Sequence, residues 1–151
     1  MREKERLFIS GCLLGLCCRF DGRSKPLPAP LLNRLQEKFQ LVPACPEQLG
    51  GLASPREPSE KCGDRFRSQS GKDVTAQYQK GAREALKLAQ FFGCQKALMK
   101  EKSPSCGFGQ IYDGTFTGTL VPGNGAAAEL LSQQGITVYG ESRIEELLAT
   151  P

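Results

Sequence analysis

The sequence has no histidine and no long hydrophobic run, and both absences limit what the protein can do. Without histidine, the chain cannot form a Ser-His-Asp triad, a Cys-His nucleophile pair or a zinc site with histidine ligands. No stretch approaches the length of a membrane span, and the charged residues 1–6 precede too few apolar residues for a secretory signal. The sequence therefore predicts a cytoplasmic protein whose sites depend on other residue types.

Excess charge of one sign is also scarce. The 151 residues carry a formal net charge of +4 at pH 7, which is too small to indicate nucleic-acid binding by itself. Hydrophobic residues make up 39% of the chain and charged residues 24%, which is enough apolar mass for one core. No repeat, low-complexity tract or linker divides the sequence, so a single domain over residues 1–151 is expected.

Cysteine, by contrast, is abundant. The chain has seven cysteines, and because this number is odd, a closed set of disulfides would leave one thiol over. In a reducing compartment such residues are buried thiols, nucleophiles or metal ligands, and their positions must decide between these roles. The seven are Cys12, Cys17, Cys18, Cys45, Cys62, Cys94 and Cys106.

Short apolar segments alternate with helical patterns along the chain. This alternation is typical of an α/β domain in which helices flank a mainly parallel, twisted, Rossmann-like sheet. Strands are expected at residues 7–10, 40–44, 96–100 and 136–139, and helices at 31–39, 75–92, 126–131 and from 142 onward.

Turn residues add detail to this outline. Asp113-Gly114, within strand-like residues 109–120, indicates a small hairpin. Residues 50–71 are rich in proline, glycine, serine and charge, and are expected to form a long ordered loop. Side-chain caps are expected at three helix N-termini, from Thr75, from Asn124 and from a capping box of Ser142 and Glu145.

Three of the cysteines occupy equivalent places in this outline. Cys12, Cys45 and Cys106 each lie just beyond the carboxyl end of an expected strand. In open parallel sheets, ligands bind in the crevice outside these strand ends. If the three strands are neighbours, the three thiols meet in that crevice. The other four cysteines do not share this placement.

Three convergent thiolates suit a soft metal site, either zinc or iron–sulfur. The spacing matches neither a ferredoxin run nor a Cys-x-x-Cys pair, so cysteine as a small buried apolar residue is the competing interpretation. Glu47, two residues beyond Cys45, is the best available proton carrier in a chain without histidine. Ser103 and Ser105 flank Pro104 in a rigid turn.

Several short motifs follow one another in a fixed order over nearly the whole chain. They are ISGCLLG at 9–15, CRFDG at 18–22, CPE at 45–47, GGL at 50–52, PR at 55–56, GKDVT at 71–75, KSPSCG at 102–107, YDGTF at 112–116 and GNG at 123–125. With these motifs, the sequence resembles the thiouracil desulfurases.

The resemblance implies a [4Fe-4S] cluster held by three cysteines, with one iron left without a protein ligand. By motif position these ligands are Cys12, Cys45 and Cys106, the cysteines at the strand ends. The family's catalytic pair corresponds to Glu47 and Ser103.

The resemblance also implies a reaction in which 2- or 4-thiouracil or thio-UMP becomes uracil or UMP plus sulfide, with no net redox change. Related desulfidases that act on thiouridine in tRNA have an extra domain that this chain lacks. We therefore expect a small thiolated pyrimidine or its nucleotide as the partner, and neither tRNA nor a membrane. Arg19, Lys102 and Ser105 are expected to bind this substrate.

Two other functions remain open from the residues alone. A non-catalytic iron–sulfur or zinc module would close its site with a fourth thiolate, from Cys17 or Cys18. A sulfurtransferase would instead carry persulfide on one reactive thiol and need no iron. The sequence assigns no role to Cys62 or Cys94 and does not indicate an oligomeric state.

Overall fold

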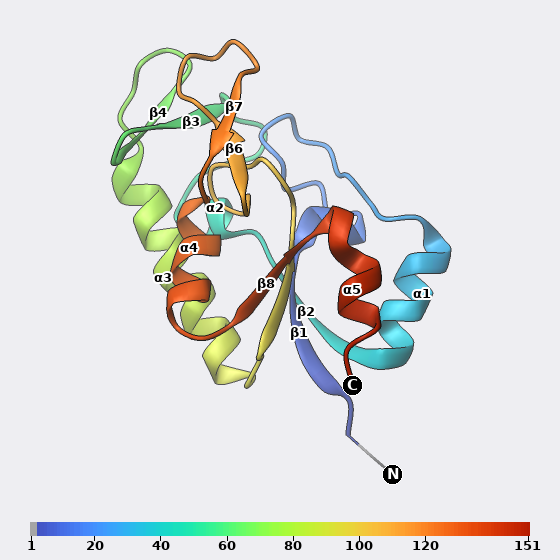
Figure 1. Cartoon of the computed structure of the whole chain (residues 1–151). Helices are drawn as coiled ribbons and strands as arrows, with labels where there is room; N and C mark the ends of the chain where they lie inside the picture. Colours follow the sequence, from blue (N-terminus) through green and yellow to red (C-terminus); the bar gives the residue numbers. More distant parts are fainter. Residues whose placement is uncertain (1–2) are drawn as a thin grey trace.

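A computed structural model describes residues 3–151 of the chain. At its centre is a four-stranded sheet in the order β2-β1-β5-β8, in which every neighbouring pair is parallel (Figure 1). All four strands lie where the sequence predicts them, so the α/β class and the parallel sheet are confirmed. They are β1 (Glu5–Ser10), β2 (Phe39–Ala44), β5 (Lys96–Met99) and β8 (Thr137–Gly140).

Helices cover both faces of this sheet. Helices α3 (Thr75–Phe91) and α4 (Ala126–Gln133) pack on one face, and α1 (Ala29–Lys38) and α5 (Ile144–Leu148) on the other (Figure 1). Because side chains alternate along a strand, Phe8 joins the first of these two apolar layers, and Leu7 and Ile9 join the second. All three side chains are fully buried, as expected of a strand covered on both faces. Within residues 3–151, no helix combines the length and apolar character needed to cross a membrane.

Two antiparallel hairpins lie beyond the carboxyl ends of the central strands (Figure 1). The hairpin of β6 (Gln110–Tyr112) and β7 (Leu120–Pro122) confirms the predicted one, although residues 113–119 connect its strands in place of a tight Asp-Gly turn. The second hairpin, β3 (Ser59–Cys62) and β4 (Arg65–Ser68), lies within residues 50–71. The prediction of one long loop there is therefore wrong, because strands this short and this charged carry no visible apolar alternation.

The predicted side-chain caps are also wrong, because each side chain has a partner elsewhere in the fold. The Thr75 hydroxyl accepts a hydrogen bond from the Phe66 N–H (2.8 Å). Asn124 Oδ1 accepts one from the Gly109 N–H (2.8 Å). In place of the capping box, the Ser142 hydroxyl donates to Glu101 (2.7 Å) and Glu145 pairs with Arg34 (2.7 Å).

A short helix that the sequence analysis missed, α2 (Pro46–Leu49), carries Glu47. It packs on α3 through two glycines, with almost no space between the backbones. A Cβ atom at Gly81 would overlap the Pro46 carbonyl group, and one at Gly50 would overlap the Gln77 carbonyl group. The absence of side chains at these two positions therefore sets where Glu47 stands.

Replacing Gly81 with alanine tests this packing. Helix propensity alone predicts that Gly81→Ala raises the free energy of unfolding by up to about 1 kcal/mol. We expect it to fall by about 1–3 kcal/mol, because the new methyl group forces α2 away from α3. Urea unfolding monitored by circular dichroism measures the change. Ala76→Gly, at an exposed position of the same helix, gives the size of the propensity effect; a stabilised Gly81→Ala protein would contradict the close contact.

Candidate active site

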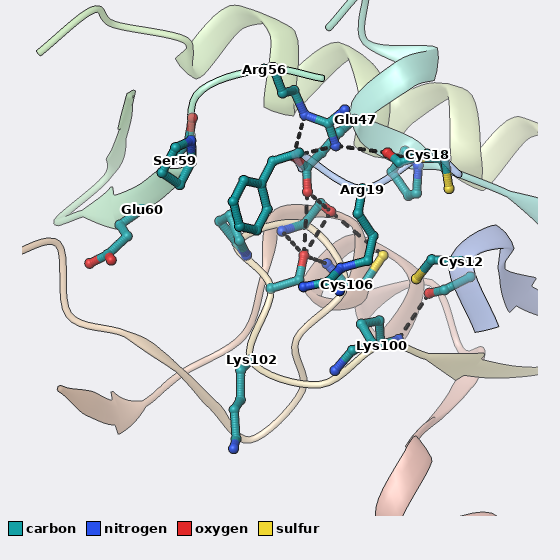
Figure 2. Close-up of a pocket in the computed structure, with 18 of the residues that line it drawn as sticks. Cys12, Cys18, Arg19, Glu47, Arg56, Ser59, Glu60, Lys100, Lys102 and Cys106 are labelled. Atoms are coloured by element: carbon teal, nitrogen blue, oxygen red, sulfur yellow. Dashed lines mark hydrogen bonds and ion pairs between the residues drawn. The ribbon is translucent and has the colours of Figure 1, made fainter. Parts of the chain in front are cut away.

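A cavity of about 580 Å³ lies beyond the carboxyl ends of β2, β1 and β5, next to the two hairpins. Its wall combines parts of the chain that are far apart in sequence. They are residues of the segments 10–25, 44–47, 56–60, 100–106 and 112–118, together with Gln69 and Tyr78. Figure 2 shows the side chains that meet there.

The three strand-end cysteines all line this cavity. Cys12 lies in the 3-10 helix that follows β1, Cys45 directly follows β2, and Cys106 lies in the turn after β5. They come together because β2, β1 and β5 are neighbours in the sheet, which was the condition on which their convergence depended. In Figure 2 the side chains of Cys12 and Cys106 point toward one another.

A fourth cysteine joins them. Cys18 is 5% exposed, lines the same cavity, and its thiol is within hydrogen-bonding range of Cys12 and Cys45. The role of Cys18 was open from the sequence, because this cysteine follows no strand. Cys18 reaches the cavity only because residues 16–18 turn back toward β2. The remaining cysteines lie elsewhere: Cys17 is exposed, Cys62 belongs to β3, and Cys94 is buried at the opposite end of the sheet.

Hydrogen bonds and burial raise the pKa values of Cys18, Cys45 and Cys106. The hydrogen bond with Cys12, reinforced by burial, raises the pKa of Cys18. The hydrogen bond with Cys18 and burial raise the pKa of Cys45 well above its usual range. Burial raises the pKa of Cys106 to about 12, although hydrogen bonds from Ser10 and Ser105 oppose this shift.

The donor set fits an iron–sulfur cluster better than a single ion. Within residues 3–151, no three Cys, Asp or Glu side chains are arranged to hold one metal ion. A cluster makes a different demand, since each cysteine binds a different iron and the sulfur atoms need not converge on one point. The cysteines that line the cavity suit this demand in their chemistry, because thiolates are the usual ligands of such clusters.

Glu47 lies in the same cavity with both carboxylate oxygens in use. Oε1 accepts hydrogen bonds from Arg56 Nε (3.1 Å) and the Tyr78 hydroxyl (2.8 Å), and Arg56 also forms an ion pair with it at 3.0 Å. The two charged side chains are only 13% and 10% exposed. Burial and the negative charge of Glu47 raise the pKa of Tyr78, so its hydroxyl stays a donor. Nothing in the sequence indicated a role for Tyr78, which lies on the core-facing side of α3.

The other carboxylate oxygen, Oε2, faces the two serines. The Ser105 hydroxyl donates to it at 2.9 Å and the Ser103 hydroxyl at 3.4 Å. Ser103 Oγ also accepts the N–H groups of Ser105 and Cys106, both at 3.1 Å. Ser105 is 2% exposed and Ser103 is half-buried, so Ser103 is the more accessible hydroxyl and Ser105 makes the shorter bond to Glu47.

The basic residues Arg19, Lys102 and Arg56 line the cavity in different ways. Arg19 is half-buried and pairs with Asp21 at 3.6 Å. Lys102 is exposed, and Figure 2 shows its side chain pointing away from the cysteines and Glu47. Arg56 is not a free cation, because it binds Glu47 and the Cys18 carbonyl oxygen (3.1 Å); the structure uses it to brace the site.

Comparison with known proteins shows the family of this chain. A family model described as 2-thiouracil desulfurase matches residues 7–143. The chain belongs to this family. The uncharacterized protein YbbK of Bacillus subtilis (strain 168) is 37% identical over 152 residues, covering 94% of this chain and 99% of YbbK. A solved structure of the [4Fe-4S]-dependent thiouracil desulfidase TudS is 43% identical, with a TM-score of 0.91 and 95% of each chain covered.

Membership of the 2-thiouracil desulfurase family confirms the resemblance drawn from the motifs. The TM-score of 0.91 likewise confirms the single α/β domain with its parallel sheet. For this desulfurase fold, the cavity at the strand ends is where the thiols, the carboxylate and the serine hydroxyls gather.

The buried thiols predict how the stability of the metal-free protein depends on pH. Cys106 titrates at about 12 in the folded state against a reference value of 9.0, so between these values the unfolded chain binds fewer protons. The free energy of unfolding should therefore be unaffected below pH 9 and fall above it, by at most about 1.4 kcal/mol per pH unit for this group. Urea unfolding of wild type and Cys106→Ala at pH 8 and pH 10.5 measures this fall in the free energy of unfolding. If the two proteins lose the same free energy of unfolding between these pH values, the prediction is refuted.

Proposed function

We propose that this protein is a desulfidase acting on a thiolated pyrimidine, either 2- or 4-thiouracil or thio-UMP. The products are uracil or UMP and sulfide, formed when water replaces the sulfur of the C=S bond, with no net redox change. The observation that carries this proposal is the meeting of Cys12, Cys45 and Cys106 with Glu47 in one cavity. Family membership and the likeness to TudS support it.

In this proposal, Cys12, Cys45 and Cys106 hold a [4Fe-4S] cluster. When bound, a cluster with one iron free of protein ligands supplies a Lewis acid that suits a soft thiocarbonyl sulfur. Burial of Cys12 and Cys106 supports this assignment, because it keeps water and oxidants away from the sulfur ligands. Cys18 is left as a neighbour of the ligands in this proposal.

Glu47 is the proposed proton acceptor. As oxygen is added to the ring carbon, a proton must leave the attacking water, and a carboxylate at the cavity wall can take it. Arg56 and Tyr78 both bind Oε1 and so fix the orientation of the carboxylate. Oε2 is left to exchange protons with the serines.

Ser103 and Ser105 form the proposed proton path to Glu47. Since two backbone N–H groups occupy the lone pairs of Ser103 Oγ, its own proton is directed at Ser105 Oγ (3.1 Å) or Glu47 Oε2 (3.4 Å). Ser105 in turn donates to Oε2 at 2.9 Å. Ser103 is the proposed group that faces substrate, and buried Ser105 connects it to Glu47.

The proposed substrate is a small molecule, and neither tRNA nor a membrane is part of the proposal. A cavity of about 580 Å³ suits a pyrimidine or its nucleotide. Arg19 and Lys102 are proposed to attract a negatively charged substituent such as a phosphate, and Ser105 to bind near the reacting edge of the ring.

Anaerobic purification with iron and acid-labile sulfide assays tests the cluster. We expect about four irons and four sulfides per chain and a brown protein that releases sulfide from 4-thiouracil. Replacing Cys12, Cys45 or Cys106 with alanine should abolish both cluster and activity. Cys94→Ala is the control, since this cysteine is as buried as Cys12 and Cys106 but lies at the far end of the sheet. A colourless protein fully loaded with zinc would overturn the proposal.

The same assays separate the two competing functions. If Cys18→Ala loses the cluster, a closed four-thiolate module is favoured. If turnover persists without iron and a single cysteine variant abolishes it, a persulfide-carrying sulfurtransferase is favoured.

Variants of Glu47 and the serines test the proton path. Glu47→Gln should retain full iron content yet release sulfide about 100- to 10,000-fold more slowly, because the amide keeps the shape but cannot accept a proton. Ser103→Ala and Ser105→Ala should each lower kcat with iron content unchanged. If Glu47→Gln released sulfide from 4-thiouracil at the wild-type rate, Glu47 would not be the proton acceptor.

A further inference from the structure

Phe116 lines the cavity but belongs to no part of the hydrophobic core. Its side chain is half-buried, and among residues 3–151 it is absent from all three clusters of packed apolar side chains. Among the described residues, Phe116 is therefore not packed into the core, and it contributes to the wall of the cavity. A ring placed in this way is available to a ligand.

The backbone at Phe116 is strained to put the ring there. Its φ angle is +58°, in the left-handed region that residues with a side chain avoid. Glycines at 114 and 118, on either side, take positive φ values without this cost. An aromatic residue kept in such a conformation needs surroundings that hold it, and strain of this kind is concentrated at functional sites.

Glu60, on β3 of the other hairpin, holds the loop of residues 113–119 in place. One of its carboxylate oxygens, Oε1, accepts the N–H groups of Gly114 (2.9 Å) and Phe116 (3.1 Å). Glu60 is 8% exposed, and within residues 3–151 it makes no ion pair, so these backbone groups stabilise its charge. The contact is also tight sterically, since a Cβ atom at Gly114 would lie 2.8 Å from Cys62 Sγ.

The loop is further stiffened by its own side chains. Asp113 accepts the N–H (3.0 Å) and hydroxyl (2.6 Å) of Thr115, and hydroxyl contacts continue from Thr115 to Thr117 (2.6 Å) and on to Thr119 (2.8 Å). The ring of Phe116 is thus presented by a rigid loop, which means that little conformational freedom is lost when a ligand packs against it.

We infer that Phe116 is a stacking platform for the flat ring of the substrate, and that Glu60 is the positioning residue that holds this platform. The inference rests on the proposed function and extends it to how the substrate is selected. A planar, unsaturated ring is favoured over a puckered ring that carries the same polar groups. Stacking of a nucleobase on an aromatic side chain contributes about 10-fold or more in affinity.

Substitution of Phe116 tests the platform by kinetics and by binding. Phe116→Leu should raise KM for 4-thiouracil about 10-fold with kcat little changed, because ground-state and transition-state binding are lost alike. Phe116→Tyr, which keeps the ring, should retain the wild-type KM. Calorimetric titration of the cluster-loaded protein should show uracil bound more tightly than 5,6-dihydrouracil in wild type, and equally in Phe116→Leu.

The role of Glu60 has its own test. Glu60→Ala should raise KM as much as Phe116→Leu does, and the double variant should show no further increase, since both changes remove the same contact. Glu60→Gln keeps an oxygen that accepts the two N–H groups and should remain close to wild type.

These measurements distinguish a stacking platform from a side chain that only covers the cavity. A wild-type KM in Phe116→Leu, or wild-type protein that binds uracil and dihydrouracil equally, would overturn the inference. Equal weakening of both rings by Phe116→Leu would also overturn it, in favour of the covering role. A wild-type protein with no desulfidase activity would be a failure of the proposed function rather than of the platform.

Discussion

The buried ion pair between Glu47 and Arg56 is the interaction on which the rest of the site depends. Arg56 binds Glu47, the carbonyl oxygens of Cys18 and Ala53, and the Ser54 hydroxyl, so one guanidinium joins α2 to two loops. Both partners are nearly buried, and removing one from such a pair leaves an unpaired charge at a cost of about 3–5 kcal/mol. The pair therefore fixes the carboxylate and, through the Cys18 carbonyl group, the loop that carries a fourth thiol.

The absence of histidine gives this arrangement its chemical character. In the proposed reaction the proton passes between serine hydroxyls and a carboxylate, which requires each donor to have a fixed acceptor. The structure meets this requirement because the two oxygens of Glu47 have different partners. Arg56 and Tyr78 donate to Oε1, and Ser103 and Ser105 donate to Oε2. The thiols and the proposed proton carriers share one cavity and meet at Ser105, whose hydroxyl also contacts Cys106 Sγ at 3.6 Å.

A second buried carboxylate, Glu60, holds the loop of residues 113–119 at the cavity. Glu60 joins the two hairpins as Glu47 joins α2 to its neighbours, but its partners are backbone N–H groups rather than a guanidinium. Both hairpins lie beyond the sheet, and each also buries an apolar side chain, Phe66 of β4 and Ile111 of β6. The parallel sheet with its helices thus supplies the sulfur atoms, and the hairpins shape the space above them (Figure 1).

The sequence by itself determined the four strands, the main helices and the equivalent positions of Cys12, Cys45 and Cys106, because apolar periodicity and strand ends are local signals. It also identified the family, since the motifs follow its order. Only the tertiary structure decided that Cys18 joins the other thiols, that Tyr78 and Arg56 hold Glu47, and that Thr75, Asn124 and Ser142 do not cap their helices. Each of these depends on contacts between residues distant in the chain, where a hydrogen bond or ion pair outweighs the local preference of the side chain.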